Sequence, residues 1–276
     1  MHRQEVRSAP YLLTGWQAPP RDIPLGSSSK VSGMPETLAN SNFTKLDIGR
    51  KLQGMKTKIE KIKEIVEKEL SCSAHNLDHV MRVHSLCIYL SEHEENVDLD
   101  VLIPAALLHD VARVIESQDK IGEIDHAVLG GKMAEKILIN LDYEEEKIEE
   151  IKHCIITHRY RSGHEPKTIE AKILFDADKL DAIGAIGIAR TFMMAGQFGQ
   201  CISKNKPLNE YMDINTSENG RLKDVSKHTP FIEYEVKLKK IPEKLYTQMG
   251  RKIGNNRLKI MDDFFTRLEL EIAGKE

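Results

Sequence analysis

The chain has 276 residues, of which 40% are hydrophobic and 30% charged, the composition of an ordinary folded protein. A formal net charge of −3 provides no general attraction to nucleic acid or to anionic membranes, which disfavours a nucleic-acid-directed activity. No apolar stretch is long enough to span a bilayer. We expect one large domain or two small ones, with a core built from aliphatic side chains because aromatic residues make up only 5% of the chain.

The cysteines and the N-terminus favour a cytoplasmic protein. The four cysteines are widely spaced and include no CxxC pair, which favours reduced thiols. The first residues lack the uninterrupted hydrophobic region of a secretory signal.

Residues 1–54 differ in composition from the rest of the chain. The first 50 residues hold five of the ten prolines and show neither helical nor strand periodicity. We expect a disordered extension over 1–54. Alternatively, translation begins at Met55 and the extension is not made. The remaining residues, 55–273, would form one domain.

Helical periodicity dominates from Met55 onward. Apolar residues at helical spacing begin a first helix at Met55, and a second follows Asp78 as a plausible N-cap. Residues 99–115 are apolar on nearly all sides and indicate a central helix, whose start we place near Pro104 because proline is best tolerated in a first turn.

The remaining elements are also predicted to be helical. Helices are expected over 125–141, 144–159 and 168–199, then an irregular excursion over 200–240 and a long helix over 242–272. In the last helix, one apolar face includes Ile260 and Phe264. Gly184 and Gly187 lie among Ala and Ile, which favours close helix packing over a phosphate-binding loop. The predicted fold class is all-α.

A His109-Asp110 doublet ends the apolar run 101–108. A carboxylate in so apolar a segment is costly unless it is paired or bound to a cation. Imidazole and carboxylate side by side can form half of a metal site. Nine of the eleven histidines lie between residues 75 and 164, which indicates one site assembled from several segments.

The order His79, His109-Asp110, Asp178 resembles the signature of the HD-domain superfamily of metal-dependent phosphohydrolases. The strings 75–84 and 171–190 also resemble its small bacterial and archaeal nucleotide-pyrophosphohydrolase-like subgroup. The resemblance covers about residues 60–273. It implies an HD-type helical bundle in which these four residues bind a divalent Mn, Fe, Co, Ni or Zn ion. In a hydrolase with such a site, Asp110 or Asp178 would help to hold the attacking water.

His126 and His158 have three open roles. In some HD families two additional histidines bind a second metal ion. The two residues could instead contact the substrate phosphate or assist proton transfer, or they could be surface residues without a role.

Several charged residues are candidates for substrate binding, each with an alternative as an ordinary surface charge. Their guanidinium, ammonium or carboxylate groups could contact a phosphate or a ribose hydroxyl. These candidates are Arg113, Arg159, Arg161, Lys179 and Asp181. Asp181 could alternatively orient a metal ligand. Arg190 is a further cation downstream of the glycine pair.

The sequence supports two classes of function. The first is a metal-dependent hydrolase of a small phosphorylated metabolite, most plausibly a nucleotide, which uses a metal-activated water. The second is a non-catalytic metal- or nucleotide-binding regulatory HD module. We expect a small-molecule partner, no nucleic acid and no membrane. A homo-oligomer is left open.

Overall fold

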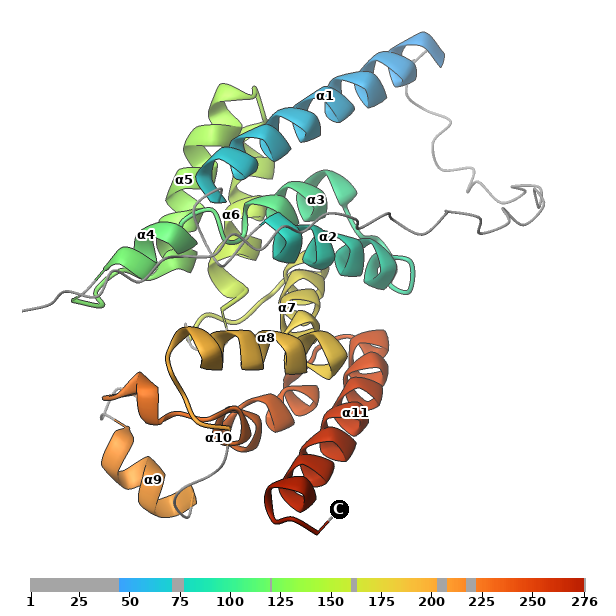
Figure 1. Cartoon of the computed structure of the whole chain (residues 1–276). Helices are drawn as coiled ribbons and strands as arrows, with labels where there is room; N and C mark the ends of the chain where they lie inside the picture. The colour runs from blue at the N-terminus through green and yellow to red at the C-terminus, as the bar shows by residue number, and fades with distance from the viewer. Residues whose placement is uncertain are drawn as a thin grey trace, which may run out of the picture. The chain divides into compact units, whose positions relative to one another are not determined.

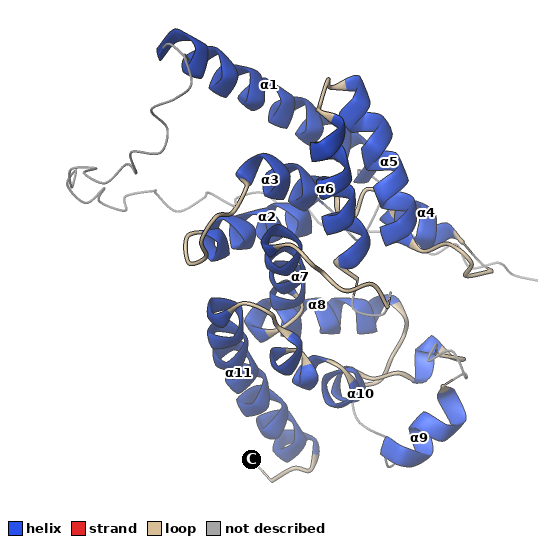
Figure 2. Cartoon of the chain, turned by 180° about the vertical axis from the view of Figure 1, so that it is seen from behind, coloured by secondary structure: helices blue, strands red, loops and turns tan. Residues whose placement is uncertain are grey.

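The computed structural model describes residues 45–70, 77–119, 121–159, 163–202, 208–216 and 222–275. Within these ranges the regular elements are helices, apart from an isolated bridge between Thr216 and Leu222 (Figures 1 and 2). The all-α class is therefore confirmed. None of the described helices combines the length and the apolar character needed to cross a membrane. Residues 1–44, most of the predicted extension, lie outside the described residues.

The first two helices agree with the predicted stripes but differ at their N-terminal ends. α1 runs from Lys45 to Leu70, so residues 45–54 are helical although they were predicted to be disordered. α2 runs from Leu77 to Ser91 and buries its predicted stripe. Asp78 lies inside the first turn of α2 and pairs with Arg82, so its prediction as an N-cap is wrong.

The predicted central helix is divided at the His-Asp doublet. α3 spans Leu99–Leu108 and α4 spans Arg113–Gln118. α3 begins well before Pro104 because the Asp98 side chain caps it by accepting a hydrogen bond from the Asp100 amide at 2.8 Å. Residues 109–112 are as buried as the helix before them, so burial does not mark the point at which the chain leaves the helix.

The next two helices are confirmed, and the predicted helix over 168–199 is two helices. α5 spans His126–Asn140 and α6 spans Glu145–Thr157. α7 spans Ile169–Asp181 and α8 spans Gly184–Gln197. The break lies at Ile183, whose extended backbone (φ −127°, ψ 168°) separates the two helices, and it is followed by Gly184, whose φ of +78° favours glycine. A Cβ at Gly187 would lie 2.3 Å from the Ala182 carbonyl oxygen, which is the close approach expected of this glycine.

The predicted excursion over 200–240 is partly irregular, as expected, in the residues that the structure describes. It contains α9 (Leu208–Asn215), α10 (Pro230–Val236) and two 3-10 turns, followed by a third at Pro242–Lys244. α11 spans Gln248–Ile272 and starts later than predicted because Thr247 caps it. Its buried face includes Met261 and Phe265, whereas Ile260 and Phe264 are 50% and 37% exposed, so the predicted face is displaced by one residue in this half of the helix.

α7 occupies the centre of the described fold. It packs against α2, α3 and α6 on one side and against α8 and α11 on the other. In Figure 1 it joins an upper group, α1 to α6, to a lower group, α8 to α11. The core is largely aliphatic as expected, and its fully buried members include Leu102, Leu107, Ile155, Ile173 and Leu174. This packing brings together the carboxyl ends of α3, α6 and α7, which carry the candidate site.

Candidate metal centre

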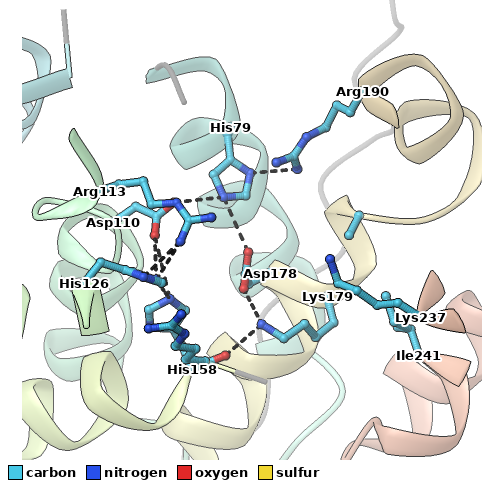
Figure 3. Close-up of a pocket in the computed structure, with 12 residues that line it drawn as sticks. His79, Asp110, Arg113, His126, His158, Asp178, Lys179, Arg190, Lys237 and Ile241 are labelled. Carbon is cyan, nitrogen blue, oxygen red and sulfur yellow. Dashed lines mark hydrogen bonds and ion pairs between the residues drawn. The ribbon is translucent and has the colours of Figure 1, made fainter. Parts of the chain in front are cut away.

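The four predicted metal ligands lie close together in the structure. His79 belongs to the first turn of α2, the His109-Asp110 doublet follows α3, and Asp178 lies in the last turn of α7. The Nε2 atom of His79 is 3.3 Å from Nε2 of His109 and 3.4 Å from Oδ1 of Asp178. It is also 3.6 Å from Oδ2 of Asp110 (Figure 3). One group of side chains that could hold a metal ion contains His79, His109 and Asp178.

The other oxygen of Asp110 faces a second group formed with His126 and His158. Oδ1 of Asp110 is 3.5 Å from Nε2 of His126 and 3.7 Å from Nε2 of His158. The two imidazole Nε2 atoms are 3.3 Å apart. His126 begins α5 and His158 follows α6. Asp110 therefore lies between two clusters, each of which could hold one ion.

Backbone carbonyls fix the orientation of two of the histidines. Nδ1 of His109 donates to the Ala106 carbonyl at 2.8 Å, and Nδ1 of His158 donates to the Ile155 carbonyl at 2.5 Å. A carbonyl only accepts, so in the neutral ring Nδ1 carries the proton and Nε2 presents a lone pair to the cluster. Burial lowers the pKa of both histidines, to about 3 for His158, and so keeps the rings neutral.

A buried carboxylate orients His79. Oδ2 of Asp181 is 2.7 Å from Nδ1 of His79, and the same carboxylate accepts hydrogen bonds from Arg82 and Arg190. Asp181 is fully buried and is not among the residues that line the pocket, and its geometry matches the alternative in which it orients a metal ligand rather than contacts the substrate. Burial lowers the pKa of His79, but hydrogen bonds to Asp178 and Asp181 outweigh burial and raise the pKa to about 9. The carboxylates around this ring therefore favour a positive charge.

Glu116, which the sequence analysis did not single out, has the corresponding place beside His126. Its Oε2 is 2.9 Å from Nδ1 of His126 and 2.7 Å from Nη1 of Arg113, and its Oε1 is 3.1 Å from Nη1 of Arg159. Burial raises the pKa of Glu116, but the hydrogen bond to His126 and the charges of the arginines outweigh burial and lower the pKa to about 2. In the sequence, the only signal for Glu116 is its position three residues after Arg113.

The two clusters present acceptors that have the chemistry of a cation site. Carboxylate oxygens and imidazole lone pairs suit divalent ions of intermediate softness such as Mn²⁺, Fe²⁺ or Zn²⁺. Burial raises the pKa of Asp110, but its interactions with His109 and Arg113 outweigh burial and hold that pKa far below its usual range, so the carboxylate is ionised. The residues present therefore fit a divalent metal ion.

A pocket of about 280 Å³ opens above the clusters. Its wall is rich in cations, namely Arg113, Arg159, Lys179, Arg190 and Lys237. Of the predicted substrate contacts, Arg113, Arg159 and Lys179 line the pocket, and Arg161 lies outside the described residues. Lys237, which follows α10, was missed because nothing distinguishes it from the other lysines of that segment. Figure 3 shows it with Ile241 on the side of the pocket opposite His126.

Comparisons with known proteins agree with this fold. The model of the HD domain matches residues 76–183. The Bacillus subtilis protein YpgQ, itself uncharacterized, is 30% identical over 206 residues, which cover 73% of this chain and 86% of YpgQ. The chain belongs to the HD domain family. Within that family, it is a relative of YpgQ.

Two solved structures extend the similarity to the fold. The crystal structure of an HD-superfamily hydrolase from Bacillus thuringiensis has a TM-score of 0.59 at 29% identity and covers 79% of this chain and 98% of its own. The crystal structure of Bacillus subtilis YpgQ in complex with ADP has a TM-score of 0.59 at 25% identity and covers 79% of this chain and 96% of its own.

Proposed function

We propose that this protein is a metal-dependent phosphohydrolase that acts on a small phosphorylated metabolite, with a nucleotide as the best-supported substrate. The observation that carries the proposal is the juxtaposition of two acceptor clusters with a pocket lined by five cationic side chains. The clusters suit a divalent ion, and the cations suit the phosphoryl oxygens of a substrate. The ADP complex of YpgQ supports a nucleotide.

The proposed ligands follow from the two clusters. His79, His109, Asp110 and Asp178 would hold one ion. Asp110, His126 and His158 would hold a second, with one Asp110 oxygen facing each ion. A divalent ion bound here supplies Lewis acidity and makes a bound water acidic near neutral pH. A second ion is better supported than proton transfer by His126 or His158, because both Nε2 atoms face the same carboxylate oxygen.

The remaining pocket residues have roles in binding and orientation. Asp110 and Asp178 accept hydrogen bonds and so can orient an attacking water. The guanidinium groups of Arg113 and Arg159 can donate to the phosphoryl oxygens, whose negative charge they offset. Lys179 donates to Oδ2 of Asp178 at 2.6 Å and to the His158 carbonyl at 2.8 Å, which fixes its ammonium group at the base of the pocket. Ile241 offers an apolar surface for a base.

The proposal is tested by product analysis on the purified protein. With Mn²⁺ and a panel of nucleotides and phosphomonoesters, we expect release of phosphate or pyrophosphate, measured by ³¹P NMR. The isosteric variant Asp110→Asn should lose both activity and bound Mn²⁺, because one carboxylate serves both clusters. The absence of turnover across the panel would refute the hydrolase assignment. Calorimetric binding of ADP without turnover would then favour the regulatory module.

A further inference from the structure

Nδ1 of His126 lies between two groups of opposite hydrogen-bonding character. Oε2 of Glu116 is 2.9 Å away, and Nη1 of Arg113 is also 2.9 Å away. The same Nη1 is 3.4 Å from Nε2 of His126, so Nδ1 is the nearer of its two contacts with the ring. An ionised carboxylate can only accept a hydrogen bond from the ring, whereas a guanidinium can only donate one to it. One ring nitrogen can satisfy only one of these two partners at a time.

The partner of Nδ1 determines whether Nε2 of His126 carries a lone pair or a proton. If Nδ1 donates to Glu116, Nε2 carries a lone pair directed toward the second cluster. If Nδ1 instead accepts from Arg113, Nε2 carries the proton and faces Oδ1 of Asp110 as a donor, 3.5 Å away. Only the first tautomer can bind a metal ion.

The other histidine of the second cluster has no such competition. Nδ1 of His158 faces the Ile155 carbonyl, which only accepts, so its Nε2 presents a lone pair in the neutral ring. The metal-binding competence of the second cluster therefore depends on His126, whose tautomer is set by side chains and not by the backbone.

We propose that Glu116 is a positioning residue that holds His126 in its metal-binding tautomer against the competing donor Arg113. It thereby sets the affinity of the second cluster for a divalent ion. This inference rests on the proposed function in that it takes His126 as a metal ligand. Glu116 is suited to the task because it also accepts from Arg113 at 2.7 Å and so engages the competing guanidinium directly.

Asp125 provides a matched control. Its carboxylate also contacts Arg159, at 2.9 Å, and it directly precedes His126 in the chain. However, it caps α5 by accepting from the Ala127 amide at 2.9 Å, and it does not serve the His126 ring. The variant Asp125→Asn removes a neighbouring negative charge while it keeps a good cap, so it separates loss of charge from loss of the tautomer.

The test compares the wild type with Glu116→Ala, Asp125→Asn and the double variant Arg113→Ala/Glu116→Ala. The His126 tautomer is measured by ¹⁵N NMR on metal-free protein, with the signal assigned by its absence in His126→Gln. Mn²⁺ binding is measured by equilibrium dialysis and elemental analysis. Circular dichroism establishes that each variant is folded.

We expect two Mn²⁺ per wild-type chain and a proton on Nδ1 of His126. Glu116→Ala should move that proton to Nε2 and weaken the second Mn²⁺ by about 10- to 100-fold. Asp125→Asn should bind as the wild type does. The double variant should recover part of the lost affinity, because the competing donor is gone; a purely structural role of Glu116 would give no such recovery.

The inference is overturned if Glu116→Ala keeps the proton on Nδ1 and its Mn²⁺ affinity, or if the double variant binds no better than Glu116→Ala. A single Mn²⁺ per wild-type chain would also overturn it, whether or not substrate is hydrolysed. If the wild type binds two Mn²⁺ but hydrolyses no substrate, only the proposed function is refuted. The Mn²⁺ affinities of the variants would still decide the role of Glu116.

Discussion

Replacement of Asp181 by asparagine tests whether a buried carboxylate holds the first cluster together. The Asp181 side chain is 1% exposed and contacts Nδ1 of His79 at 2.7 Å. It also accepts from Nε of Arg82 at 2.6 Å and from Arg190. Asparagine keeps the shape and one acceptor, but it removes the anion that the two guanidinium groups share, and only Arg82 keeps a second carboxylate partner, Asp78.

The expected loss of stability follows from this environment. Removal of one partner of a buried ion pair costs about 3–5 kcal/mol. The Arg82 and Arg190 side chains are 26% and 28% exposed, so water compensates in part and the lower end applies. We expect Asp181→Asn to reduce the free energy of unfolding by about 3 kcal/mol, roughly a 150-fold change in the folding equilibrium. Metal affinity should fall by about 10- to 100-fold, because His79 loses the carboxylate that orients it.

Urea unfolding in the presence of a chelator measures the free energy of unfolding without a contribution from bound metal. Mn²⁺ binding is then measured separately. Asp78→Asn is the control, because Asp78 pairs with the same Arg82 but its side chain is 73% exposed; it should change stability by less than about 1 kcal/mol. If Asp181→Asn cost less than about 1 kcal/mol, or if the two variants were equally destabilised, the role assigned to this carboxylate would be wrong.

Two further predictions concern the scaffold. Gly187→Ala should destabilise the protein by about 1–3 kcal/mol, because the added Cβ would lie 2.3 Å from the Ala182 carbonyl oxygen. Gly196→Ala in the same helix adds a Cβ that meets nothing within 4 Å, so it should stabilise the protein by about 0.5–1 kcal/mol. Equal melting temperatures for the two variants would contradict this packing. Burial raises the pKa of Asp98, but the hydrogen bond from Lys147 outweighs it and places the folded pKa below the ordinary 3.8. The ion pair therefore stabilises the fold above pH 3.8, and this stabilisation is lost as the pH falls through the lowered pKa of Asp98. The difference in free energy of unfolding between the wild type and Asp98→Asn should therefore vanish in acid. A difference that persists in acid would exclude this ion pair as its source.

Local sequence information identified the helices that have a single apolar stripe. In α2, residues Val80, Val83, Cys87 and Leu90 are all buried, as their spacing predicts. Where the chain stays buried from one element to the next, the same information could not locate the ends of helices. The break after Leu108 depends on a turn, and the one after Asp181 depends on the backbone of Ile183 and Gly184.

The sequence also indicated most residues of the site through their order along the chain. His79, His109, Asp110 and Asp178 were predicted as a set, and the structure brings them together. Their type is decisive because imidazole and carboxylate groups are costly to bury without partners. A signature of this kind is local in chemistry, so it can be recognised before the fold is known.

Tertiary structure alone decided which groups support these residues. Asp181 meets His79 across 102 positions of sequence, and Glu116 meets Arg159 only because α4 and the end of α6 lie together. Lys237 reaches the pocket from the irregular segment after α10. Contacts of this kind depend on how the helices pack, and no periodicity or spacing within one segment encodes them. The sequence by itself therefore determined the helical class and the chemistry of the site, whereas the fold decided how that site is oriented and enclosed.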